Sequence, residues 1–60
     1  MSDEVWITNI ENASEMAASR YGYEAVIFLF AKYGATCLED LSESHYSEVF
    51  SELYLMSQDY

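Results

Sequence analysis

A 60-residue chain with 11 acidic side chains, and with Arg20 and Lys32 as its basic ones, is poorly suited to direct nucleic-acid binding, because affinity for phosphate backbones comes largely from Lys and Arg. Its 52% hydrophobic and 17% aromatic content excludes a disordered chain despite the formal net charge of -9. A single cysteine, Cys37, excludes an intrachain disulfide, and no apolar run approaches the ~20 residues of a membrane span. We therefore expect a cytoplasmic protein that binds neither nucleic acid nor membranes.

The length predicts one domain over residues 1–60 with a small core. A chain this short buries only about 60% of the surface that its unfolded form exposes, so its stability should be marginal. Small folds usually add a disulfide, a metal or a partner chain. Self-association is therefore the leading way in which this core could be supplemented.

The first predicted helix covers about residues 5–21. At 100° per residue, one face holds Trp6, Ile10, Ala13, Ala17 and Tyr21. Gly22 follows, with Arg20 in the last turn, and this pair predicts a helix that ends at a left-handed glycine. A later start near Ala13 stays open, because Asn12 and a glutamate three residues on have capping-box spacing.

The second predicted helix covers about residues 23–33 and contains the apolar run AVIFLFA. A buried strand is the alternative, but Glu24 in the first turn, Lys32 in the last and the lack of a strand partner favour a helix. The wide apolar arc consists of Val26, Ile27, Leu29, Phe30 and Tyr33. The other side carries Glu24, Ala25, Phe28, Ala31 and Lys32.

Two further elements follow Gly34. Thr36 and Glu39 have capping-box spacing and predict a short helical turn over 37–41, and Ser42 is expected to cap a last helix over about 43–57. The apolar face of that helix holds Tyr46, Val49, Phe50, Leu53 and Tyr54, with Glu48, Glu52 and Asp59 opposite. The predicted fold class is all-α, a compact bundle of three main helices plus one short helical turn.

The chain carries no residue set typical of an enzyme. His45 and Glu48 lie one helical turn apart, but two ligands do not make a metal site, and Cys37 is the one other soft ligand. Cys37 and His45 lack an orienting group and an oxyanion hole, and Cys37 is expected to be a buried structural thiol. We expect no catalytic residue, no cofactor and no metal.

The second helix suggests a protein interface. A helix that is apolar nearly all round is normally surrounded by protein, so either the other helices enclose it or Phe28, between Ala25 and Ala31, meets a partner. The leading hypothesis is a homodimer, or another protein contact, through Glu24, Ala25, Phe28, Ala31 and Lys32. Tyr23 and Tyr60 are further candidates, whereas core-edge packing is expected for Tyr21, Tyr33, Tyr46 and Tyr54.

The acidic residues suggest an alternative from another class. Glu11 and Glu15, like Glu48 and Glu52, are four residues apart, which stacks carboxylates about 6 Å apart along a helix. This is about twice the phosphate rise of one DNA strand. An acidic DNA mimic that occupies the cleft of a basic DNA-binding protein is therefore possible, although ordinary solvated helices show the same spacing.

Residues 20–53, with the pieces YGA, LEDL and YSEVFSEL, resemble small uncharacterised proteins encoded by bacterial conjugative transposons and related mobile elements. The resemblance implies a mobile-element setting, in which helper and regulatory proteins and anti-restriction DNA mimics both occur. It carries over no catalytic residue. The expected function is thus that of a small acidic interaction or regulatory protein, with the DNA mimic as the alternative.

Overall fold

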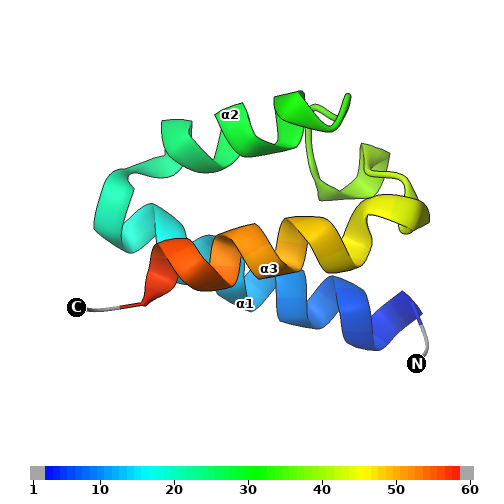
Figure 1. The fold of residues 1–60 in the computed structure, drawn as a ribbon, viewed down its shortest axis with the longest axis horizontal. Coiled ribbons are helices and arrows are strands. Elements are labelled where there is room, and N and C mark those ends of the chain that lie inside the picture. Colours follow the sequence, from blue (N-terminus) through cyan, green and yellow to red (C-terminus); the bar gives the residue numbers. More distant parts are fainter. Residues whose placement is uncertain (1–2, 59–60) are drawn as a thin grey trace.

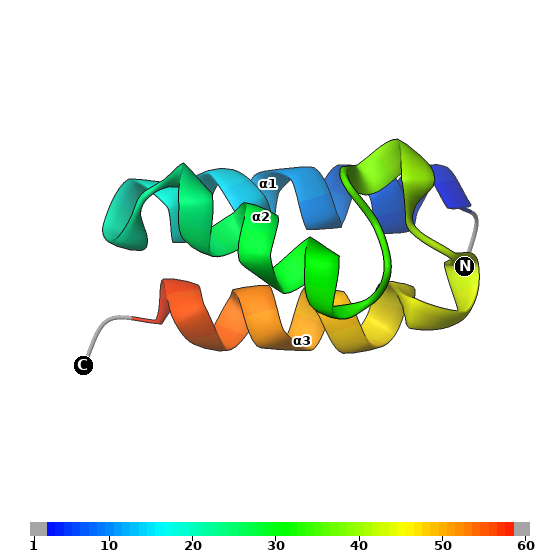
Figure 2. The same ribbon diagram turned by 90° about the horizontal axis from the view of Figure 1, so that it is seen from above.

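Three α-helices form the protein in the computed structural model, which describes residues 3–58: α1 (Asp3–Tyr21), α2 (Tyr23–Lys32) and α3 (Tyr46–Ser57). Two short 3-10 turns, η1 (Leu38–Asp40) and η2 (Glu43–His45), lie between α2 and α3. α1 and α3 run in the same direction and α2 runs opposite to both (Figure 1). Seen from above, α2 starts beside α1 and crosses towards α3 (Figure 2). The predicted all-α class is confirmed.

α1 is one continuous helix that starts at Asp3, so the alternative start near Ala13 is wrong. Asp3 and Glu4 lie in the first turn, where negative charges interact favourably with the helix dipole and stabilise the helix. Ala13 is instead one of three buried positions of this helix, which are Ile10, Ala13 and Ala17. Tyr21, expected at the edge of the core, is 56% exposed because it belongs to the last turn, beside the chain reversal.

The two glycines end α1 and α2 in different ways. Gly34, at φ 77°, closes a Schellman motif, in which the Ala35 N–H donates to the Phe30 carbonyl and the Gly34 N–H to the Ala31 carbonyl, both at 3.0 Å. Gly22 has φ 92° and ψ 155°, which is outside the left-handed helical region predicted for it. Its N–H donates to Ala18 of α1 and its carbonyl accepts from Ala25 of α2, so one residue joins two antiparallel helices.

The connection from α2 to α3 differs in detail from its prediction. Because η1 begins after Cys37, Thr36 lies one residue before the cap position. Its N–H and hydroxyl donate to the Asp40 carboxylate, at 3.2 and 3.3 Å, in place of the predicted pairing with Glu39. Ser42 does act as a cap, with its hydroxyl accepting from the Ser44 N–H at 3.4 Å. The helix predicted over 43–57 is thus split into η2 and α3, and Asp59 lies outside the described residues.

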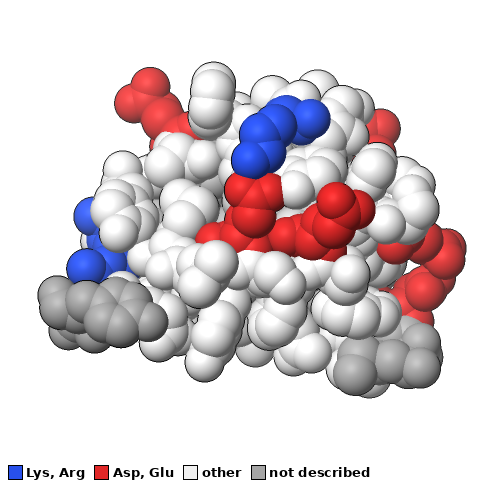
Figure 3. Space-filling model, in the orientation of Figure 1, with Lys and Arg blue, Asp and Glu red and all other residues white. Residues whose placement is uncertain are grey.

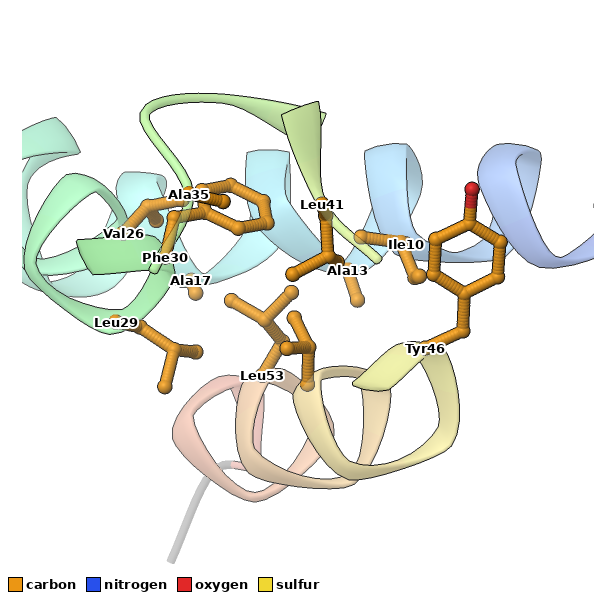
Figure 4. Close-up of a cluster of buried hydrophobic side chains, with 11 residues drawn as sticks. Ile10, Ala13, Ala17, Val26, Leu29, Phe30, Ala35, Leu41, Tyr46 and Leu53 are labelled. Carbon is orange, nitrogen blue, oxygen red and sulfur yellow. The ribbon is translucent and has the colours of Figure 1, made fainter. Parts of the chain in front are cut away.

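A buried hydrophobic cluster fills the space between the three helices (Figure 4). Its members are Ile10, Ala13, Ala17, Val26, Leu29, Phe30, Ala35, Leu41, Tyr46, Val49 and Leu53. The two alanines of α1 are small and leave room for the larger side chains that α2 and α3 contribute. Leu41, between the two turns, closes the cluster from the connecting segment. No helix within residues 3–58 has both the length and the hydropathy needed to cross a membrane.

Candidate functional site

The solvent-facing side of α2 exposes a large aromatic residue. Phe28 is 76% exposed, and Glu24 and Ala31, one turn to either side, are exposed as well. We call Glu24, Phe28 and Ala31 the α2 outer face. Burial of Val26, Leu29 and Phe30 on the other side of the helix leaves these positions pointing away from the core. α1 and α3 therefore do not enclose α2 completely.

Two flanks border the α2 outer face. On the side towards α3 are Ala25, which is half-buried, and Lys32. On the side towards α1 are Tyr23, which is 68% exposed, and Ile27, which is 46% exposed. Ile27 was predicted in the buried arc. The buried residues of α2 are Val26, Leu29 and Phe30, at the i, i+3, i+4 spacing of one helix face. Ile27 does not belong to this spacing and lies at the edge of the face.

Lys32 and Glu52, predicted to belong to two different functional surfaces, bind each other. The Lys32 Nζ donates to Glu52 Oε1 at 2.7 Å, and the Tyr33 hydroxyl donates to Glu52 Oε2. The hydrogen bond to Glu52 raises the pKa of Tyr33 to about 12. Lys32 and then Tyr33 lower the pKa of Glu52. These residues are about 20 positions apart, so no local pattern in the sequence indicates this contact.

His45 and Cys37 do not come together. His45 lies between a carboxylate and a ring, with Nδ1 3.4 Å from Glu48 Oε1 and its ring centroid 5.1 Å from that of Tyr33. Cys37 is exposed, so the expectation of a buried thiol is wrong. It directly precedes η1, on the surface of the connecting segment. Within residues 3–58, no three His, Cys, Asp or Glu side chains are grouped as metal ligands.

A groove of about 1020 Å³ lies between α1, α2 and η1. Its floor is apolar and consists of Ile7, Val26, Ile27, Phe30 and Leu38. Three exposed carboxylates, those of Glu11, Glu15 and Glu39, stand along it. We call this feature the α1–α2 groove. Along its length α2 crosses from α1 towards α3 (Figure 2).

The four glutamates of the proposed DNA-mimic face therefore lie in two places. Glu11 and Glu15 border the α1–α2 groove. Glu48 and Glu52 lie on α3, where Glu52 contacts Lys32 on the opposite flank of α2. Figure 3 shows acidic side chains beside a basic one on the face formed by α2 and α3, surrounded by uncharged surface. The structure thus brings each pair together but separates the two pairs.

Ser14 lines the α1–α2 groove from α1. Its hydroxyl is buried and has no hydrogen-bond partner among the described residues. A buried hydroxyl without a partner costs about 1–3 kcal/mol.

Aromatic rings join α1 and α3 on another surface. The rings of Trp6 and Phe50 meet edge to face with centroids 6.0 Å apart, and those of Phe50 and Tyr54 stack at 6.1 Å. Tyr54, expected at the edge of the core, is more than half exposed, and the adjacent Leu55 is 65% exposed. Of the other tyrosines, Tyr46 is buried and Tyr33 half-buried, and Tyr60 lies outside the described residues.

Comparison of the chain with protein-family models, with curated proteins and with solved structures found no match.

Proposed function

We propose that this chain is a small cytoplasmic interaction or regulatory protein of a mobile element, which acts through protein contacts and self-associates through α2. The observation that supports this most is the 76% exposure of Phe28 at the centre of the α2 outer face. Full burial of a Phe side chain contributes about 1.5–3 kcal/mol, which is a large share for a chain with a small core. A stable dimer buries about 800 Å² per partner. That area is about a fifth of the 4120 Å² that the chain exposes.

The charges on α2 favour an antiparallel two-fold arrangement. Glu24 and Lys32 stand four residues before and after Phe28. If the two-fold axis passes near Phe28, Glu24 faces the partner subunit's Lys32, and Lys32 faces the partner subunit's Glu24. Lys32 remains half-exposed while it binds Glu52, and its ammonium has three N–H donors. The half-buried Ala25 and the exposed Ala31 are small enough to let two such helices approach closely.

The test is size-exclusion chromatography with light scattering on the wild type and on Phe28→Glu. We expect a wild-type dimer and a monomeric Phe28→Glu variant, because the substitution places two carboxylates at the centre of the contact. Leu55→Glu is the matched control, since it makes the same change at an exposed apolar residue of α3, and it should remain dimeric. An unchanged assembly state in Phe28→Glu would show that this face is not the interface.

A charge exchange tests the antiparallel register. Glu24→Lys alone and Lys32→Glu alone should each weaken the dimer, since like charges would then meet across the axis. A mixture of the two variants should form a heterodimer, in which every such pair is again of opposite charge. Failure of the mixture to associate better than either variant would argue against this register.

The DNA-mimic alternative has weaker support. Glu52 already binds Lys32 and Tyr33, and the two glutamate pairs lie on opposite flanks of α2. A mimic would form a salt-sensitive complex with a basic DNA-binding protein that duplex DNA displaces.

A further inference from the structure

The α1–α2 groove combines an apolar floor with a charged border of one sign. Val26 and Phe30 are almost fully buried beneath it, and Ile27 is half exposed on its α2 side. Glu11 and Glu15 are exposed along its α1 side, and Glu39 of η1 is exposed as well. Such a surface favours a ligand with an apolar stripe between basic side chains.

None of the described residues that line the groove carries a positive charge that could balance its three carboxylates. Among the described residues that form the groove there is no Lys or Arg. Lys32 binds Glu52 on the opposite flank of α2. The whole chain has two basic side chains against 11 acidic ones, so a second copy cannot offer a basic segment. A basic segment of another protein can supply the complementary charges, whereas an anionic membrane surface would be repelled.

The walls of the groove favour a helical ligand. Within residues 3–58 there is no sheet edge to which an extended peptide could add as a strand, whereas α1 and α2 form two helical walls. The volume of about 1020 Å³ is just above the range for ligand pockets, about 300–1,000 Å³. Glu11 and Glu15 are one helical turn apart, so Lys or Arg residues spaced four apart on a bound helix match them.

We propose that the α1–α2 groove binds a basic amphipathic helix of another protein, with apolar residues of that helix on the groove floor and Lys or Arg residues against Glu11, Glu15 and Glu39. The groove contains none of Glu24, Phe28 and Ala31, although Tyr23 and Ile27 belong both to its lining and to a flank of the α2 outer face. Peptide binding is therefore tested on a chain that does not self-associate as well as on the wild type.

The test uses a synthetic peptide of about 14 residues, four helical turns, with Leu at helical spacing and Lys elsewhere, titrated into the full chain by calorimetry. We expect saturable binding with one peptide per chain. The double variant Glu11→Gln, Glu15→Gln should weaken it about five- to tenfold, because two exposed ion pairs are removed. Ile27→Ala should weaken it about threefold or more through lost apolar contact, and circular dichroism checks that both variants remain folded.

Two matched controls separate the groove from general charge attraction. The variant Glu4→Gln, Glu48→Gln removes the same charge away from the groove and should change the affinity less than twofold. A peptide of the same composition with its Leu residues scrambled should bind much more weakly. Any of three results would overturn the proposal. The two double variants could have equal effects, the two peptides could bind equally well, or the amphipathic peptide could fail to bind. The monomeric Phe28→Glu variant should bind the peptide as the wild type does, which keeps this outcome distinct from that of the self-association experiment.

Discussion

At the scale of single residues, Glu52 connects α2 and α3 at the surface. Its carboxylate accepts hydrogen bonds from the Lys32 ammonium and from the hydroxyl of Tyr33, the residue that follows α2. The Lys32–Glu52 pair is partly exposed, and such pairs contribute about 0.2–1 kcal/mol. Its main consequence is positional, because it holds the C-terminal end of α2 against α3 while the N-terminal end is tied to α1 through Gly22.

These contacts predict how Tyr33 titrates. A pKa raised from 10.0 to about 12 means that the folded state favours the protonated phenol. The stabilisation is complete below pH 10 and is lost as the pH rises towards 12. For Glu52 the pKa is lowered from 4.5, so its stabilisation is present above pH 4.5 and is lost as the pH falls through the lower folded value.

NMR titration of the Tyr33 ring checks the first of these. In Glu52→Gln the pKa of Tyr33 should fall back towards 10, because its strongest perturbing contact is removed. Glu48→Gln is the matched control and should lower it much less, since Glu48 acts on Tyr33 through charge alone. An ordinary tyrosine titration in the wild type would contradict the hydrogen bond between Tyr33 and Glu52.

Ser14 gives a second prediction at this scale. Ser14→Ala removes a buried hydroxyl without a partner and places a better helix former in α1. We expect the free energy of unfolding to rise by about 1–2 kcal/mol, which corresponds to an increase of roughly 4–8 °C in Tm per kcal/mol. Ser19→Ala is the control, because Ser19 is exposed on the same helix and gains helix propensity alone. Equal gains in the two variants, measured by thermal denaturation, would show that the Ser14 hydroxyl carries no penalty.

At the scale of elements, the two glycines determine how the helices connect. Gly34 ends α2 in a left-handed conformation that Asn also tolerates. Gly22 combines φ 92° with ψ 155°, a region that is essentially restricted to glycine. A Cβ at either position would meet no atom within 4 Å beyond its own chain neighbours, so any cost of substitution comes from the backbone.

Substitution by Asn therefore distinguishes the conformation of Gly22 from that of Gly34. Gly22→Asn should lower the free energy of unfolding by about 1–3 kcal/mol, because Asn does not populate this region. Gly34→Asn should cost less than about 1 kcal/mol, since the left-handed region accepts Asn. Urea denaturation measures both. A cost for Gly34→Asn as large as that for Gly22→Asn would contradict the distinction between the two turns.

At the scale of the whole molecule, a small core coexists with a net charge of -9. If two copies associate through α2 as proposed, their net charges repel each other, and the apolar contact at Phe28 and the pairs between Glu24 and Lys32 oppose this repulsion. Salt screens the repulsion, since the Debye length falls from about 10 Å at 0.1 M to about 3 Å at 1 M. In the light-scattering experiment we therefore expect the dimer to persist and strengthen as salt is added.

The sequence by itself determined the fold class and the approximate extent of the elements. The period of apolar residues in α1 and α3, the glycines after Tyr21 and Tyr33, and Ser42 as a cap are local signals, and local hydrogen bonding acts on them directly. The phase of Phe28 placed it opposite the apolar arc of α2 but left open whether the other helices enclose it, and the structure shows it 76% exposed. Local signals failed at Tyr21 and Cys37, where burial depends on what lies opposite in space.

Only the tertiary structure decided which surfaces exist. Glu11 and Glu15 of α1 border the α1–α2 groove, whereas Glu48 and Glu52 belong to α3, where Glu52 meets Lys32 on the other flank of α2. These contacts join residues about 20 positions apart, and a helical wheel gives the direction of a side chain but not the neighbour it meets. The direction in which each helix packs is set by the shared core of all three, so no single helix sequence contains it.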